Sequence, residues 1–221
     1  MVDLSSILDA YLRRESEPPK PDVFHASELA YCLRQSYLRR VEPREWPSSK
    51  LRIFQSGNLV HELVRRVLSE ADDMGVTLVD YERPFEFIFE DFSIRGRMDD
   101  LVWIRTGGDK ELVPIEVKSV GAPFRLDQLA EPTPEHVCQL TVYLRAARVQ
   151  RGIIWYLERS YLTDKWFWVS YSKKLFDLLV DRARTLYGYL LRRELPPAES
   201  QLIRPWECAH CLYRATHCND G

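Results

Sequence analysis

The sequence lacks any long hydrophobic run. It has no N-terminal apolar segment with a basic flank, and no uninterrupted apolar stretch is long enough to cross a bilayer. We therefore expect a protein with no membrane partner, soluble and cytoplasmic. Internal repeats and low-complexity tracts are also missing, and 221 residues are enough to bury a sizeable core. These features predict a single domain over residues 1–221.

The sequence also lacks a large net charge, and it has few cysteines. The formal net charge is only -2, which excludes a chain-wide positive field, so any nucleic-acid contact must come from local basic surface or a bound metal. The five cysteines are an odd number, and three fall within the last fourteen residues. This distribution argues against a secreted disulfide framework and favours metal binding by reduced thiolates.

Hydrophobic periodicity predicts five helices and a set of strands. The helices are expected at Leu4–Arg14, from an N-cap at Ser27 to a point before Pro43, from Gly57 to about Gly75, at Glu135–Val149 and at Lys173–Arg193. The strands are expected at Phe85–Phe89, Met98–Ile104, Leu112–Val117, Gly152–Leu157 and Trp166–Tyr171. This order predicts an α/β fold with a mixed central sheet flanked by helices.

Two predicted strands bring acidic side chains together. The turn at 106–109 joins them into a hairpin, which places Asp99 of the first strand near Glu116 of the second. In the second strand, Ile115 and Val117 alternate with Glu116 and Lys118, so the ionisable side chains share the face opposite the apolar pair.

Converging carboxylates repel each other unless a cation lies between them. With oxygen ligands, that cation would be Mg²⁺ or Mn²⁺, and Lys118 would be able to reach an attacking water or a phosphate. The alternative is a solvated strand face on which Asp99, Glu116 and Lys118 form ordinary surface ion pairs.

The C-terminal segment contains a second group of possible metal ligands. Cys208 and Cys211 are followed by Cys218, and Cys32 is the natural fourth thiol because Cys138 belongs to a different predicted helix. Such a site would join a subregion of about residues 22–45 to residues 195–221 and offset the entropy of ordering the tail. Spacing leaves zinc, an iron-sulfur cluster and no metal open. His210 and His217 also allow alternative zinc sets.

Six motifs in this order resemble the CRISPR-associated RecB-like exonucleases, an iron-sulfur branch of the PD-(D/E)xK nuclease superfamily. Each motif is weak alone, but together they span nearly the whole chain. The superfamily's name-giving proline is absent, because Met98 precedes Asp99. The six motifs are Cys32–Tyr37, Gly57–His61, Gly96–Asp99, Ile115–Lys118, Gln139–Tyr143 and the terminal cysteine group.

The resemblance implies a restriction-endonuclease-like core and assigns roles to single residues. Lys118 would orient water or stabilise developing charge, and Gln139 and Tyr143 would reach the site from one helix face. Strand alternation directs Asp100 away from the site. The implied metal ligands are His61, Asp99, Glu116 and the carbonyl of Val117. The implied cluster ligands are Cys32, Cys208, Cys211 and Cys218, with [4Fe-4S] favoured over [2Fe-2S].

The resemblance further implies a metal-dependent exonuclease that acts on single-stranded DNA ends during CRISPR spacer acquisition, with CRISPR integrase proteins as partners. One alternative is a non-catalytic nucleic-acid-binding module with a zinc-stabilised tail, and another is an RNA-processing nuclease of the same fold. Four arginines near Cys32 favour a phosphate-contacting patch. They are Arg34, Arg39, Arg40 and Arg44.

Overall fold

The structure, a computed structural model, describes residues 2–13, 19–121, 126–199 and 205–218. Its helices are α1 (Leu4–Leu12), α2 (Leu33–Val41), α3 (Ser48–Ser69), α4 (Pro134–Ala147), α5 (Lys173–Arg192), α7 (Pro205–Ala209) and α8 (Arg214–His217). Its strands are β1 (Val23–His25), β2 (Val76–Ile88), β3 (Ser93–Thr106), β4 (Asp109–Val120), β5 (Arg151–Glu158) and β6 (Asp164–Ser170). Arg14, the predicted end of the first helix, lies outside the described residues.

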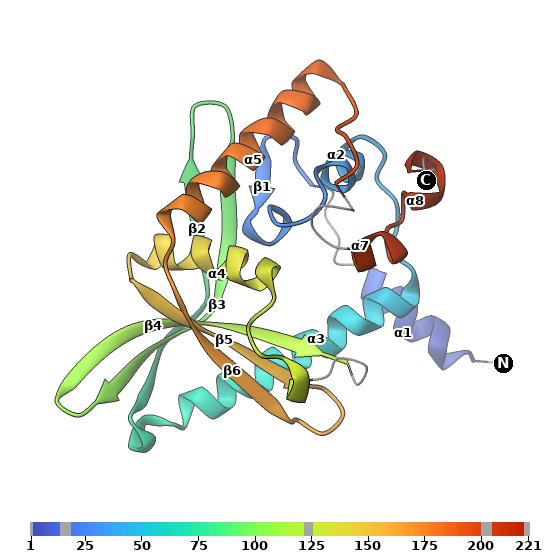
Figure 1. Cartoon of the computed structure of the whole chain (residues 1–221). Helices are drawn as coiled ribbons and strands as arrows, with labels where there is room; N and C mark the ends of the chain where they lie inside the picture. The colour runs from blue at the N-terminus through green and yellow to red at the C-terminus, as the bar shows by residue number, and fades with distance from the viewer. Residues whose placement is uncertain (1, 14–18, 122–125, 200–204, 219–221) are drawn as a thin grey trace.

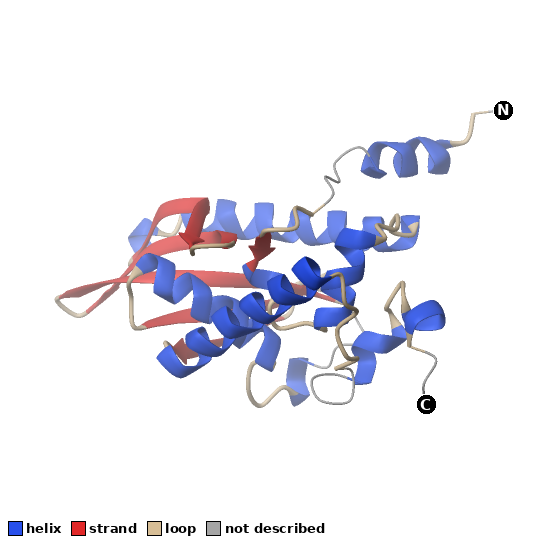
Figure 2. Cartoon of the chain, turned by 90° about the horizontal axis from the view of Figure 1, so that it is seen from above, coloured by secondary structure: helices blue, strands red, loops and turns tan. Residues whose placement is uncertain are grey.

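The six strands form one mixed sheet, as predicted. Its order is β1-β3-β4-β5-β6, with β2 paired to β3, and β1·β3 and β4·β5 are the parallel pairs. α4 connects the parallel strands β4 and β5, the usual use of a helical crossover. Helix α3 covers one face of the sheet, and α4 and α5 cover the other (Figures 1 and 2). The α/β prediction is therefore confirmed.

Two apolar clusters hold these layers together. Val60 and Val64 of α3 pack with Val113, Ile115 and Val117, the inward-facing residues of β4. On the other face, buried side chains of α4 and α5 pack against β3, β5 and β6. The alternation predicted for β4 is confirmed, since its apolar side chains face α3. None of the described helices has both the length and the hydropathy needed to cross a membrane.

Strand β3 forks along one edge. Its first residues, Ser93 to Arg95, pair with β1, whereas the residues from Asp100 onward pair with β4. Residues 96–99 lie between these two pairings. Their edge is therefore open to side chains from elsewhere, and this opening places Gly96–Asp99 beside the space between β1 and β4.

Two predicted helix starts are wrong. Ser27 lies in a 3-10 turn, Ala26–Glu28, and α2 begins later, with Cys32 at its N-cap. Gly57 lies inside α3, which starts after Pro47, because packing of a long apolar face outweighs the roughly 1 kcal/mol that glycine costs in a helix. A methyl group at Gly57 would meet Ser119 at an ordinary 3.9 Å.

Contacts from the C-terminal segment explain why α2 starts at Leu33. The backbone N–H of Cys32 donates to Glu207 Oε1 at 3.1 Å, and that of Leu33 donates to Glu199 Oε2 at 2.9 Å. Carboxylates at a helix N-terminus satisfy its free N–H groups and oppose the helix dipole. The two segments predicted to form one subregion are thus in contact, and α7 and α8 lie beside α2 (Figure 1).

The predicted phosphate-contacting patch of arginines is not what the structure shows. Arg34 donates to the carbonyls of Pro196 and His217, and Arg44 donates to the carbonyl of Leu212. Arg39 lies over the ring of Trp46. These side chains bind the protein itself, and sequence spacing alone has no information about such long-range contacts.

The fourth arginine forms a buried ion pair whose removal should be costly. Arg40 donates to both oxygens of Glu28, at 2.7 and 2.9 Å, and its side chain is only 2% exposed. We expect Glu28→Gln to lower the free energy of unfolding by roughly 3 kcal/mol and the melting temperature by roughly 6–12 °C, because a buried charge loses its partner.

The matched control is Asp177→Asn, which breaks the exposed pair with Lys173. Its free energy of unfolding should change by less than about 0.5 kcal/mol. Equal denaturation curves for the two variants would contradict a stabilising role for the buried pair.

Candidate active site

The carboxylates of Asp99 and Glu116 meet where β3 and β4 separate. The last ladder pair before the fork is Asp100 with Ile115, so Asp99 and Glu116 occupy the next positions on the opposite face of the sheet. Asp99 Oδ2 also accepts a hydrogen bond from the backbone N–H of Val117 at 2.8 Å. This contact holds Asp99 against β4 in the absence of ladder pairing.

Helix α3 brings a histidine to the same place. His61 Nδ1 lies 3.6 Å from Asp99 Oδ2. Burial lowers the pKa of His61, with Glu116 opposing that shift, so the imidazole is neutral near pH 7 and able to bind a cation. The structure therefore gathers His61, Asp99 and Glu116 from three separate elements.

Glu116 begins a chain of polar contacts that ends on α4. Its Oε1 lies 2.5 Å from Lys118 Nζ, which donates to Gln139 Oε1 at 2.9 Å. Gln139 Nε2 in turn donates to the hydroxyl of Tyr143 at 2.7 Å. The predicted helix face of Gln139 and Tyr143 thus does point toward the carboxylates, and Gln139 fixes the position of the lysine.

Burial strongly perturbs the ionisation of these groups. It raises the pKa of Asp99 to about 7 and that of Glu116 to about 7, with repulsion between the two adding to the shift of Glu116. Burial opposes the charge of Lys118, but Glu116 and Asp99 hold the pKa of the lysine above its ordinary value. Burial and the same two carboxylates raise the pKa of Tyr143. Such shifts concentrate at functional sites.

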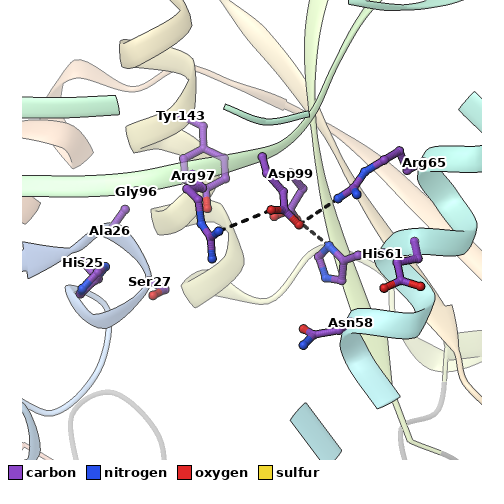
Figure 3. Close-up of a pocket in the computed structure, with 12 residues that line it drawn as sticks. His25, Ala26, Ser27, Asn58, His61, Arg65, Gly96, Arg97, Asp99 and Tyr143 are labelled. Carbon is purple, nitrogen blue, oxygen red and sulfur yellow. Dashed lines mark hydrogen bonds and ion pairs between the residues drawn. The ribbon is translucent and has the colours of Figure 1, made fainter. Parts of the chain in front are cut away.

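A cavity of about 450 Å³ opens onto His61 and Asp99 (Figure 3). Asp99 lines it, whereas Asp100 is absent from its lining. Glu82, Arg65 and Arg97 also line it, together with residues from the β1 segment. Sequence patterns missed Glu82, which follows no periodic signal. Arg97 falls within the Gly96–Asp99 motif. Its position two residues before Asp99 was the sequence signal that could have identified it as a site residue.

The donor set suits a hard divalent cation. Both carboxylate oxygens of Glu116 are fully buried, and Lys118 Nζ lies 2.5 Å from Oε1. Repulsion from Asp99 acts on this buried carboxylate, and a cation between the two acids would offset it. In the part of the chain that the structure describes, no three His, Cys, Asp or Glu side chains are already spaced as ligands of one metal ion.

The four predicted thiols line one pocket between the two ends of the chain. Cys32 at the start of α2 faces it together with Cys208, Cys211 and Cys218. Arg34 Nη1 lies 3.8 Å from the sulfur of Cys218 and also binds the carbonyl of His217. Cys138 on α4 does not line this pocket. The structure therefore separates the fifth cysteine from the other four, as predicted.

The sequence profile of the PD-(D/E)XK nuclease superfamily matches residues 6–218. That match covers nearly the whole chain. The chain belongs to the PD-(D/E)XK nuclease superfamily. Its mixed sheet and helices are the core of this nuclease superfamily. No curated protein sequence matches the chain.

Solved structures share the fold of this nuclease. The crystal structure of SSO0001 is 18% identical with a TM-score of 0.66, covering 99% of this chain and 97% of that one. An alkaline exonuclease (LHK-Exo) from Laribacter hongkongensis is 12% identical with a TM-score of 0.55, covering 85% and 93%. LHK-Exo in complex with dAMP is 15% identical with a TM-score of 0.51, covering 77% and 88%.

Gly96 allows an aromatic ring to lie against the site. A Cβ at this position would fall 2.4 Å from Cζ of Phe85, whose ring packs edge-on against Tyr143 at 5.5 Å between centroids. We expect Gly96→Ala to lower the free energy of unfolding by about 1–3 kcal/mol and to reduce nuclease activity, because Phe85 must move toward Tyr143.

Gly57→Ala is the matched control for this prediction. Its Cβ meets ordinary contact distances inside a helix, so we expect unchanged or slightly raised stability by chemical denaturation. A Gly96→Ala variant as stable and active as Gly57→Ala would show that the close approach has no consequence.

Proposed function

We propose that this nuclease is a metal-dependent DNA exonuclease that acts on single-stranded ends. The observation that supports this best is the pair formed by Asp99 and the fully buried Glu116, beside His61 and Lys118 in a PD-(D/E)XK fold. Raised pKa values of both acids indicate charge that the protein alone leaves poorly compensated. In ordinary surface ion pairs, the carboxylates would be exposed to solvent. The side chain of Glu116 is instead fully buried, because the residue is 0% exposed.

His61, Asp99 and Glu116 would hold Mg²⁺ or Mn²⁺, with the carbonyl of Val117 as a further ligand. When bound, the cation supplies Lewis acidity and neutralises charge on the scissile phosphate. The oxygen-rich set favours these hard ions over softer metals. The neutral state of His61 near pH 7 is the form that binds a metal.

The residues of the chain have complementary tasks in phosphodiester hydrolysis. Lys118 stays protonated, and its ammonium group stabilises the negative charge that develops on the phosphate and orients the attacking water. Gln139 keeps Nζ of Lys118 in place, and Tyr143 supports the amide of Gln139. The ammonium group of Lys118 lies 2.5 Å from Glu116 Oε1, so it would be placed beside a cation held by that carboxylate and beside the phosphate.

Two findings support single-stranded DNA ends as the proposed substrate. The resemblance to the CRISPR-associated RecB-like exonucleases implies them, and two structural neighbours are structures of an alkaline exonuclease, one in complex with dAMP. A role in CRISPR spacer acquisition in the cytoplasm, with CRISPR integrase proteins as partners, rests on the resemblance alone.

Cys32, Cys208, Cys211 and Cys218 would hold an iron-sulfur cluster, of the [4Fe-4S] type rather than [2Fe-2S]. Their convergence on one pocket from residues nearly 190 positions apart in sequence supports this assignment. The cluster would clamp the C-terminal segment to α2, where carboxylates of that segment already cap the helix. Its role in this proposal is structural, within one domain that spans residues 1–221.

The test is cleavage of internally labelled substrates of about 30 nucleotides, linear or circular, each with Mg²⁺, with Mn²⁺ or with excess chelator. We expect linear single-stranded DNA to be degraded with either metal, and circular single-stranded DNA to resist. Chelator should stop the reaction, and RNA of equal length should remain intact. Binding without cleavage under every condition would support the non-catalytic module instead, and preferential loss of RNA would support the RNA-processing alternative.

A further inference from the structure

A carboxylate bridges two arginines in the wall of the cavity beside Asp99. Glu82 of β2 binds Arg65 Nη2 through Oε1 at 2.9 Å and Arg97 Nη1 through Oε2 at 3.4 Å. Arg65 comes from α3 and Arg97 from β3, so the two guanidinium groups point toward each other across the opening (Figure 3). His61 and Asp99 line the same cavity.

The backbone of Glu82 is unusual for a residue within a strand. Its φ is +44°, in the left-handed region that non-glycine residues rarely adopt. Its neighbours Tyr81 and Arg83 pair with Asp100 and Met98, so Glu82 stands opposite Asp99 without a regular ladder pair. Backbone strain of this kind persists where surrounding contacts stabilise it, and it concentrates at functional sites. Here the conformation accompanies a carboxylate directed into the cavity.

The two arginines are held differently. Arg65 stacks over the ring of Tyr81 at 4.1 Å, and its side chain is 25% exposed. Its Nη2 binds Glu82, so the exposed part of the guanidinium group lies at the cavity. Arg97 is 71% exposed and only loosely paired with Glu82. One arginine is therefore anchored, and the other is free to adjust.

Glu62 and Asp99 also line this cavity, but Glu82 is the acid that is ion-paired with both arginines. Two guanidinium groups face one carboxylate, which presents two oxygens much as a phosphodiester does. The opening also continues beyond Arg97 into a second cavity of about 670 Å³, which shares His25, Gly96 and Arg97 with the first. Arg95 lines that second cavity and pairs with Glu86 at 2.8 Å. A strand leaving the metal site along this path would meet arginines on the way.

We propose that Arg65 and Arg97 bind a backbone phosphate of the substrate strand next to the scissile one, and that Glu82 occupies the phosphate's place between them until DNA displaces it. This inference rests on the proposed function and adds a phosphate subsite and an internal competitor to it. It is a binding step with no covalent change, and its readout is therefore affinity.

The experiment measures binding of fluorescein-labelled oligo(dT) of 20 nucleotides by anisotropy in chelator, over a range of salt concentrations. Arg97→Ala should weaken binding roughly tenfold and make the dependence of log Kd on log salt shallower by about 0.7. Glu82→Gln should tighten binding by roughly three- to tenfold and steepen that dependence, because the competing charge is gone. Effects of opposite sign distinguish this arrangement from a purely structural ion bridge.

Matched controls come from β2, the strand that carries Glu82. Arg83→Ala and Asp80→Asn change the same charges in the neighbouring pair, which lies outside the lining of both cavities, and should bind within twofold of the wild type. Equal or weaker binding by Glu82→Gln, or identical curves for Arg97→Ala and Arg83→Ala, would overturn the phosphate subsite. If the wild type still degrades DNA in that case, the nuclease proposal survives. A wild type that neither binds nor cleaves DNA refutes both.

Discussion

Asp99→Asn should lower the rate of DNA cleavage by at least about 10³-fold while leaving the fold intact. The amide oxygen of asparagine can still accept the hydrogen bond that Val117 now donates to Asp99 Oδ2. The substitution removes one anionic ligand from the proposed cation site and changes almost no volume. Initial rates on end-labelled single-stranded DNA, with thermal denaturation of the same samples, measure both parts of the prediction.

Asp100→Asn is the sharpest control for this result. Asp100 is adjacent in sequence and has the same side chain, but it is absent from the lining of the cavity that Asp99 faces. Its burial raises its pKa to about 6, so an acid with a perturbed pKa is replaced in both variants. We expect Asp100→Asn to retain activity within a few-fold. Equal losses in the two variants would contradict the assignment of Asp99 as the ligand.

If the four thiols hold the proposed iron-sulfur cluster, Cys208→Ala and Cys32→Ala should each abolish iron binding and loosen the C-terminal segment. These thiols come from opposite ends of the chain and line one pocket, so loss of either opens the same cluster site. We expect the melting temperature to fall by roughly 10 °C, because the clamp adds to the contacts of Glu199 and Glu207 with α2. Iron analysis and thermal denaturation are the measurements.

Cys138→Ala is the control, because this cysteine lies on α4 outside the pocket. It should retain the full iron content and nearly the full melting temperature. If the wild-type protein is colourless and contains zinc, the four thiols bind zinc instead of an iron-sulfur cluster, and the proposal for the nuclease core is unaffected. Wild-type iron content in both Cys208→Ala and Cys32→Ala would contradict the clamp.

Local patterns were enough to predict the elements that carry the acids. Strand alternation placed Glu116 and Lys118 opposite Ile115 and Val117, and the predicted hairpin brought Asp99 near Glu116. In the structure, Asp99 lies one step beyond the last ladder pair. The turn lies between Thr106 and Asp109, which pair across Gly107 and Gly108. These features depend on residues close in sequence, so periodicity was sufficient to find them.

Long-range contacts were beyond the reach of the same reasoning. The start of α2 depends on Glu199 and Glu207, more than 160 residues away, and no local signal at Ser27 or Cys32 indicates this. Arg34 was expected to contact phosphate, but it donates to backbone carbonyls of the tail. A basic side chain looks the same in a sequence whether it faces solvent or a folded-back segment.

Strand β1 and the residue Glu82 show the same limit within the site. β1 has only three residues, and its parallel pairing with β3 creates the fork that exposes Gly96–Asp99. Glu82 sits in an unusual backbone conformation that no propensity predicts. Tertiary packing decides both features, and both shape the cavity that opens onto Asp99.

We propose above all that His61, Asp99 and Glu116 share one divalent cation beside Lys118. Crystals soaked in Mn²⁺ and measured near the manganese absorption edge test it directly. We predict an anomalous peak between these three side chains, with Lys118 moved off Glu116, and no such peak in Asp99→Asn. An empty site in wild-type crystals at saturating Mn²⁺, with the Lys118–Glu116 ion pair intact, would contradict the account.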